Sequence, residues 1–151
     1  MPQSLSRVVV HLVFSTKIRA PWLRDSALRD ELYKYMGGIL VNVECPPILI
    51  GGVEDHVHVL CNLSRKLAIM NLIEEIKTEP SKWLKTKSPH LAEFYWQAGY
   101  GAFSVSQSNI EVVKKHIANQ AEHHKQTSFQ DEFRKLCVRH EIDIDEKYVW
   151  D

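Results

Sequence analysis

The sequence predicts an α+β fold of the ferredoxin-like (split β-α-β) type: an antiparallel sheet with helices on one face and extra C-terminal helices. Short β-branched runs alternate with longer segments in which apolar residues recur every three or four positions. The first six of these elements follow the order strand, helix, strand, strand, helix, strand. The 151 residues contain no internal repeat or obvious linker, so we expect one domain over residues 1–151.

The first half of the chain supplies three strands and one helix. Residues 7–15 (RVVVHLVFS) are apolar and β-branched, which favours a strand. Residues 25–41 carry one apolar stripe at helical spacing and predict a helix. Two short apolar runs, 46–53 and 56–63, meet near a glycine pair and predict adjacent strands.

A second helix is predicted over residues 68–85. Pro80 lies inside it and is expected to kink or split it, because proline cannot donate the helical hydrogen bond. Residues 94–96 and 100–105 have the composition of short strands.

The chain closes with two amphipathic segments, about 109–125 and about 129–140, that predict helices. On the first of them, His116 and Gln120 lie about 40° apart around the axis, beside the apolar stripe. This polar edge could offer both side chains to a site on the sheet, and the alternative interpretation is a solvated helix face.

Composition is that of a soluble globular protein, with 44% hydrophobic and 25% charged residues. No run reaches membrane-spanning length, so no membrane partner is expected. The start of the chain lacks the pattern of a secretory signal. The three cysteines are odd in number and widely spaced, which indicates reduced thiols and a cytoplasmic location.

Charge patterning permits a local contact with a polyanion. Lys+Arg and Asp+Glu both total 19, and this balance argues against indiscriminate affinity for nucleic acids. A basic segment nevertheless contains Lys82, Lys85 and Lys87, which are candidate phosphate contacts. The alternative interpretation of these lysines is a solvated helix face.

The motif Asp55-His56-Val57-His58 places two imidazoles in an apolar run. Residues two apart in a strand share a face, with Cα atoms ~6.6 Å apart, so both rings can converge on one metal ion. Polar rings on a buried face are costly unless a metal or a hydrogen-bonded core satisfies them. We expect this strand to be central, with the histidine face open to a ligand.

Five motifs together resemble the single-tyrosine HUH transposases of the TnpA type, which include insertion-sequence and REP-associated transposases. They are His56-Val57-His58, residues 96–100 (WQAGY), 103–106 (FSVS), 117–124 (IANQAEHH) and 148–151 (YVWD). The resemblance runs over essentially the whole chain in the same order.

The resemblance implies a divalent metal, Mg²⁺ or Mn²⁺, held by His56, His58 and Gln120. It implies single-stranded or hairpin DNA as the substrate and a homodimer as the assembly. The implied reaction is metal-assisted DNA strand cleavage and transfer, the chemistry of DNA transposition.

The resemblance also aligns His116 with the nucleophilic tyrosine of the family, and no tyrosine lies on this predicted helix. Phosphodiester attack by the family requires the tyrosine oxygen. Three interpretations of His116 stay open: a site that binds DNA and metal but has lost strand transfer, a replacement nucleophile, or a metal ligand beside His56 and His58. The main alternative function is a non-catalytic DNA-binding module or regulator derived from a transposase.

Overall fold

The computed structural model describes residues 2–150, in which four strands form one antiparallel sheet. The strands are β1 (Val9–Ser15), β2 (Pro47–Gly52), β3 (His56–Asn62) and β4 (Gly101–Val105). Their order is β2-β3-β1-β4, so β3 and β1 are central and every neighbouring pair is antiparallel. This is the split β-α-β arrangement, and the predicted fold class is confirmed.

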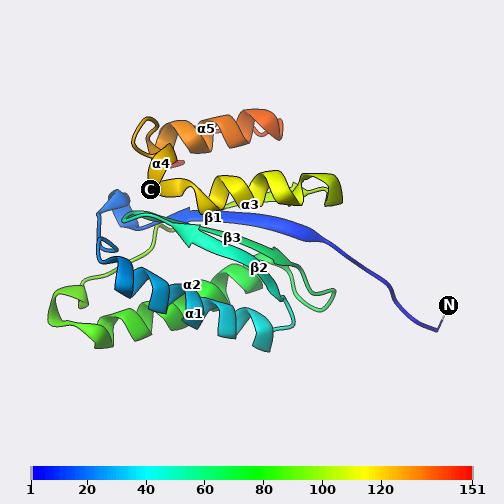
Figure 1. Cartoon of the computed structure of the whole chain (residues 1–151), viewed down its shortest axis with the longest axis horizontal. Coiled ribbons are helices and arrows are strands. Elements are labelled where there is room, and N and C mark those ends of the chain that lie inside the picture. Colours follow the sequence, from blue (N-terminus) through cyan, green and yellow to red (C-terminus); the bar gives the residue numbers. More distant parts are fainter. Residues whose placement is uncertain (1, 151) are drawn as a thin grey trace.

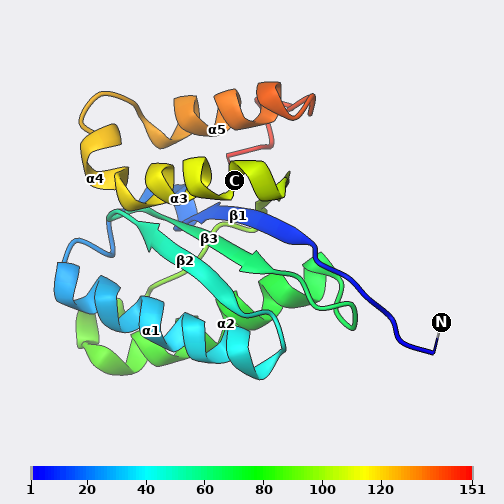
Figure 2. The same ribbon diagram turned by 45° about the vertical axis from the view of Figure 1, so that its right-hand side comes forward.

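Helices cover both faces of the sheet (Figure 1). The helices α1 (Ser26–Asn42) and α2 (Ile69–Lys87) lie side by side on one face. The opposite side carries α3 (Ile110–Ala118), α4 (Gln120–His123) and α5 (Phe129–Arg139), visible again in Figure 2. Short 3₁₀ turns occupy Lys17–Arg19, Pro89–Leu91 and Gln107–Asn109.

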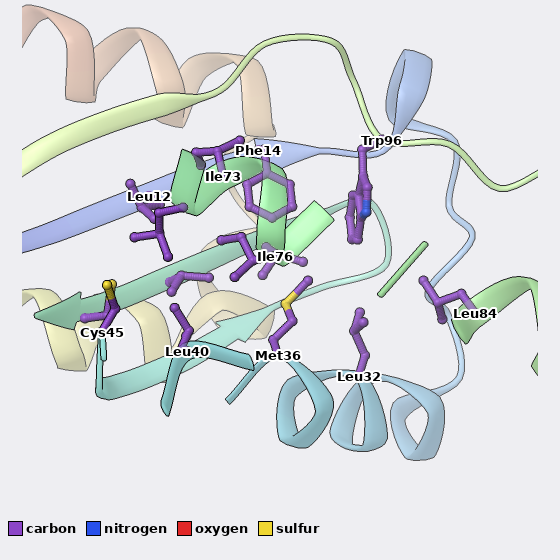
Figure 3. Close-up of a cluster of buried hydrophobic side chains, with 14 of the residues drawn as sticks. Leu12, Phe14, Leu32, Met36, Leu40, Cys45, Ile73, Ile76, Leu84 and Trp96 are labelled. Carbon is purple, nitrogen blue, oxygen red and sulfur yellow. The ribbon is translucent and has the colours of Figure 1, made fainter. Parts of the chain in front are cut away.

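The larger apolar core lies between the sheet and the α1–α2 layer (Figure 3). Alternate residues of β1, Leu12 and Phe14, point into this core, where they meet apolar side chains of both helices. The α1 side chains that complete it recur at helical spacing: Leu32, Met36 and Leu40, all fully buried. Burying one such side chain contributes about 1.5–3 kcal/mol, so this face anchors the domain.

The other face of the sheet combines apolar and polar side chains. Val13 of β1 and Phe103 of β4 pack against α5, whereas Leu60 of β3 packs against α3. His56 and His58 lie on this face and are 0% exposed. The expectation that their face is open to a ligand is therefore wrong, because the C-terminal helices cover it.

Three details of the predicted elements also differ from the structure. The predicted split at Pro80 does not occur: α2 continues through Pro80 as one helix, with Ile76 and Leu84 buried in the core on either side. The helix predicted over 109–125 is divided at Asn119, whose backbone leaves helical geometry between α3 and α4. Residues 94–96 contribute one isolated bridge, Thr16 to Trp96, instead of a strand.

None of the helices within residues 2–150 is both long and apolar enough to cross a membrane. Cys45, Cys61 and Cys137 are buried and free, as the sequence predicted for reduced thiols.

Gly51 of β2 pairs with His58 and lets α3 approach the sheet closely. A Cβ on Gly51 would lie 2.8 Å from Ile117 Cγ2 and 3.0 Å from the Ile117 carbonyl oxygen. We expect Gly51→Ala to lower the free energy of unfolding by about 1–3 kcal/mol, since overpacking forces α3 outward. Urea denaturation measures this change.

The matched control is Gly38→Ala on α1, where a Cβ meets nothing within 4 Å. Alanine in a helix should raise stability there by up to about 1 kcal/mol. Equal stability of Gly51→Ala and wild type would contradict the close approach.

Candidate metal centre

Glu132 lies at the centre of a buried polar cluster between the sheet and the C-terminal helices. Ser128 begins α5 as its N-cap, with Oγ accepting a hydrogen bond from the Asp131 backbone N–H at 3.1 Å. Glu132 falls in the first turn, three residues after Phe129 and four before Leu136, so helical spacing turns it inward with them. Only 3% of Glu132 is exposed.

The Oε1 oxygen of Glu132 faces β3. It lies 3.0 Å from His58 Nε2 and 3.6 Å from His56 Nε2. Strand alternation brings both rings to this face, as the H-x-H spacing predicted.

The Oε2 oxygen of Glu132 faces α3 and α4. Gln120 donates its Nε2–H to Oε2 at 3.0 Å, and His116 Nε2 lies 2.9 Å away. His123 Nε2 and His124 Nε2 follow at 3.1 and 3.3 Å. α4 reaches this position because it crosses above the turn between β2 and β3 (Figure 2).

Asp55 fixes the orientation of His56. Its Oδ1 lies 2.7 Å from His56 Nδ1, and since a carboxylate only accepts, Nδ1 carries a proton. A neutral His56 then presents the lone pair of Nε2 to the cluster, 2.9 Å from Gln120 Oε1. Acceptors of three residues, His56, Gln120 and Glu132, therefore converge on one region, which calls for a shared proton or a cation.

His11 supports His58 from the neighbouring strand β1. His11 Nε2 and His58 Nδ1 are 2.8 Å apart, and the two rings stack with centroids 5.0 Å apart. Burial lowers the pKa of His58 from 6.5 to about 4, although Glu132 acts in the opposite direction. Burial, with His58 beside it, also lowers the pKa of His11 well below its usual value. Both rings are therefore neutral at pH 7, the form that binds metals.

Glu132 remains ionised in this setting. Burial alone would raise the pKa of its carboxyl, but the close imidazoles of His116, His124 and His58 outweigh burial and hold the pKa well below its usual range. A permanent negative charge thus lies among imidazoles and favours a bound cation.

The donor atoms on the sheet side fit a divalent metal ion. His56, His58 and Glu132 each offer a ligand atom, all within 4.8 Å of one another. Neighbouring ligands around an ion with bonds of about 2.1 Å lie about 3 Å apart, close to the separations of 2.9 to 3.6 Å seen here. Two imidazoles with carboxylate and amide oxygens suit Mn²⁺ or Mg²⁺.

A second group of ligand atoms lies nearer the surface. His116, His123 and Glu132 offer atoms within 4.8 Å of one another, and His116 falls in this group instead of the group with His56 and His58. The group lines a cavity of about 250 Å³ together with Lys135 and Arg139 of α5. Both cations are exposed at its wall.

The structure therefore brings His56, His58, Gln120 and His116 together, as their motifs predicted. It keeps the three candidate lysines apart from them, on α2 across the sheet. There Lys82 pairs with Glu79 at 3.6 Å, Lys87 pairs with Glu31 at 3.0 Å, and Lys85 lies 4.3 Å from the Tyr95 ring centroid.

Sequence reasoning missed Glu132, although a signal existed: an acid within the apolar stripe of the last helix. It also assigned no role to Asp55, although Asp55 directly precedes the H-x-H motif. His123 and His124 entered the sequence analysis only as part of the segment 117–124, and both reach Glu132.

Comparison with known proteins connects this geometry to a family. The model of the family "Transposase IS200 like" matches residues 4–120. A protein assigned as a transposase from Deinococcus radiodurans R1 has a similar fold, with 20% identity, a TM-score of 0.61, and 78% of this chain and 93% of that chain covered.

A REP-associated tyrosine transposase bound to a REP hairpin is similar at 12% identity, with a TM-score of 0.62 and 89% and 85% of the two chains covered. At such identities the two structures establish the fold alone. A search of curated protein sequences finds no match.

The lowered pKa of His58 predicts how stability of the metal-free protein depends on pH. Between its ordinary value of 6.5 and about 4, the unfolded chain binds more protons than the folded one. This contribution is complete above pH 6.5 and is lost as the pH falls towards 4, by up to about 3 kcal/mol.

Urea denaturation in EDTA at several pH values measures the loss. His58→Asn should flatten the dependence, whereas Val112→Ala, an exposed non-titrating change on α3, should retain it. An unchanged slope in His58→Asn would contradict a buried neutral His58.

Proposed function

Because the chain belongs to the IS200-like transposase family, we propose that it binds single-stranded or hairpin DNA together with a divalent metal, and that it has lost tyrosine-dependent strand transfer. The metal ligands are His56, His58 and Gln120, joined by Glu132. The observation that supports the proposal is that His116 faces this centre from α3, and the family resemblance implies that this is the position of the nucleophile.

Different residues of the centre would orient the metal ligands and connect the elements that carry them. Asp55 and His11 orient the two imidazoles of β3 through their Nδ1 atoms. Gln120 connects β3 and α5, because its Oε1 lies 2.9 Å from His56 Nε2 and its Nε2–H donates to Glu132. A bound divalent ion would polarise a phosphate oxygen of the DNA.

The absence of a nucleophile follows from where the tyrosines lie. Tyr33 and Tyr35 belong to α1 on the opposite face of the sheet, and Tyr95, Tyr100 and Tyr148 are exposed. Within residues 2–150, no tyrosine forms a hydrogen bond or ring contact with the histidine cluster. This arrangement supports the proposed loss of a phosphotyrosine intermediate.

The proposed DNA path runs over the cavity beside α5. Lys135 and Arg139 line its wall, and neither makes a hydrogen bond or ion pair within the described residues. Two uncommitted cations next to a metal centre attract phosphates. The similar REP-associated transposase is described as bound to a REP hairpin, which supports a hairpin ligand here.

A second candidate keeps catalysis, with His116 as a replacement nucleophile. The observation favouring it is the 2.9 Å contact between His116 Nε2 and Glu132 Oε2, since carboxylates orient reactive imidazoles in this way. Attack by His116 on a phosphodiester would form a phosphoramidate and release a DNA hydroxyl. Such an adduct is acid-labile, whereas a phosphotyrosine is not.

We also propose a homodimer, following the family resemblance. Multi-angle light scattering of the purified chain tests it, and a monomer at all concentrations would exclude it.

His116→Tyr is predicted to restore a covalent protein–DNA adduct on hairpin DNA with Mn²⁺, because it returns a phenol to α3 beside the metal centre. Wild type should form none. Denaturing electrophoresis of labelled DNA measures the adduct.

The matched control is His116→Phe, which adds a ring without a hydroxyl and should form no adduct. An adduct on wild-type protein that acid destroys would support the His116 nucleophile and overturn the loss of catalysis.

Wild type should bind hairpin DNA with an affinity that falls as salt rises, because binding releases counterions. We expect Lys135→Ala with Arg139→Ala to weaken binding at least tenfold and to lower the salt slope by about 2, one unit per lost phosphate contact. Fluorescence anisotropy at several salt concentrations measures both quantities.

The comparison variant carries Lys82→Ala, Lys85→Ala and Lys87→Ala on the opposite face. A larger loss in this triple variant would place the DNA over α2 instead. No binding at any salt would overturn the DNA proposal.

A further inference from the structure

We propose that a second divalent metal ion binds between His116, His123 and the Oε2 oxygen of Glu132, so that Glu132 bridges two metal ions. The inference goes beyond DNA binding, because it assigns an additional metal site and a ligand role to His116. The first ion uses Glu132 Oε1 with His56 and His58.

The distances fit three ligands of one ion. His116 Nε2 lies 2.9 Å and His123 Nε2 lies 3.1 Å from Glu132 Oε2. The two imidazole rings face one another at a steep angle, with centroids 4.8 Å apart and planes inclined by 66°. Around an ion with metal–ligand bonds of about 2.1 Å, neighbouring ligand atoms are expected to lie about 3 Å apart.

Unsatisfied nitrogens at the site point to a missing cation. His123 Nε2 is buried and makes no hydrogen bond, despite its short distance to Glu132. Buried polar atoms without partners are rare and costly, and a metal ion would satisfy this one.

His124 has a second buried nitrogen that lacks a hydrogen bond. Its Nδ1 donates to the Thr127 carbonyl at 2.7 Å, so a neutral ring turns the lone pair of Nε2 towards Glu132. That nitrogen is also buried and without a hydrogen bond. A positive charge beside Glu132, either a proton or a metal ion, would stabilise the close approach of His123 Nε2 and His124 Nε2 to Glu132 Oε2.

The two groups of ligands belong to separate ions. They share Glu132 alone, and they approach its carboxylate from opposite sides, one from β3 and the other from α3 and α4. A carboxylate that uses each oxygen for a different ion is the usual bridge of two-metal sites that act on phosphate esters.

The outer site is accessible and suits a transition metal. The side chains of His116 and His123 are 32% and 29% exposed, and they line the cavity of about 250 Å³. Two imidazoles, one carboxylate and an open position form the ligand set of catalytic zinc sites. Zn²⁺ or Mn²⁺ is therefore the expected ion, with water or an anion drawn by Lys135 and Arg139 as its remaining ligand.

Metal stoichiometry of the full chain tests the inference without DNA. Protein stripped with chelator is titrated with Zn²⁺ by calorimetry, and bound metal is counted by mass spectrometry after desalting. We expect two ions per chain in wild type. His116→Ala and His123→Ala should each reduce the count to one.

The inner site is tested in parallel with His56→Ala, which should leave the outer ion bound. His90→Ala, which alters an exposed histidine outside the cluster, should keep two ions. These variants separate loss of the outer site from loss of the inner one, and hairpin binding is scored independently.

One ion per chain in wild type would overturn the inference, and so would two ions in both His116→Ala and His123→Ala. A measurement on unaltered protein avoids any folding defect: two carboxylate-bridged Mn²⁺ ions couple magnetically, so the Mn²⁺ resonance signal should weaken as the second equivalent binds. Additive, uncoupled signals would also count against the bridge.

Discussion

Glu132 carries a negative charge into the interface between the sheet and the C-terminal helices, where it meets imidazoles and one amide instead of water. Transferring a carboxylate out of water costs several kcal/mol unless close partners compensate it. Five histidines supply that compensation, one pair from β3 and the others from α3, α4 and the residue after α4. The position of α5, which carries Glu132, and the positions of the histidines consequently depend on one another.

This constraint explains the contrast between the two faces of the sheet. Leu12 and Phe14 on one face need only apolar volume, which α1 and α2 provide. On the other face, His11 and His58 must find partners of defined geometry, so α3 and α5 are held by polar contacts as well as by packing. The face whose polar groups are harder to satisfy is also the face that carries the candidate metal centre.

The cluster around Glu132 also shows what His116 contacts in this structure. The family resemblance implies a tyrosine here, whose phenol would face the candidate metal centre, whereas His116 brings a nitrogen that contacts Glu132. Under the proposed function, a metal ligand stands where the family resemblance implies an attacking group, and His116 adds to the imidazoles around the carboxylate. Six of the eight histidines of the chain lie in this region, counting His11 with the five around Glu132.

Local sequence patterns were enough to predict several features of this cluster. Alternation within the H-x-H motif was enough to predict that His56 and His58 share a face, because strand geometry has a fixed period of two. Helical spacing likewise brought His116 and Gln120 to one edge, and the break at Asn119 did not separate them. Boundaries of α1 and β3 agreed closely with the predicted ranges for the same reason.

The sequence by itself determined the order of strands and helices and the polar face of β3, since both follow from short-range periodicity. Only the tertiary structure decided that this face is closed and that Glu132, some 75 residues from the H-x-H motif, completes it. Burial of an acid within an apolar stripe depends on which histidines lie opposite, and that depends on how α5 packs on the sheet. The helical period predicts that Glu132 lies on the inner side of α5. It does not predict which charged or polar side chains lie opposite Glu132.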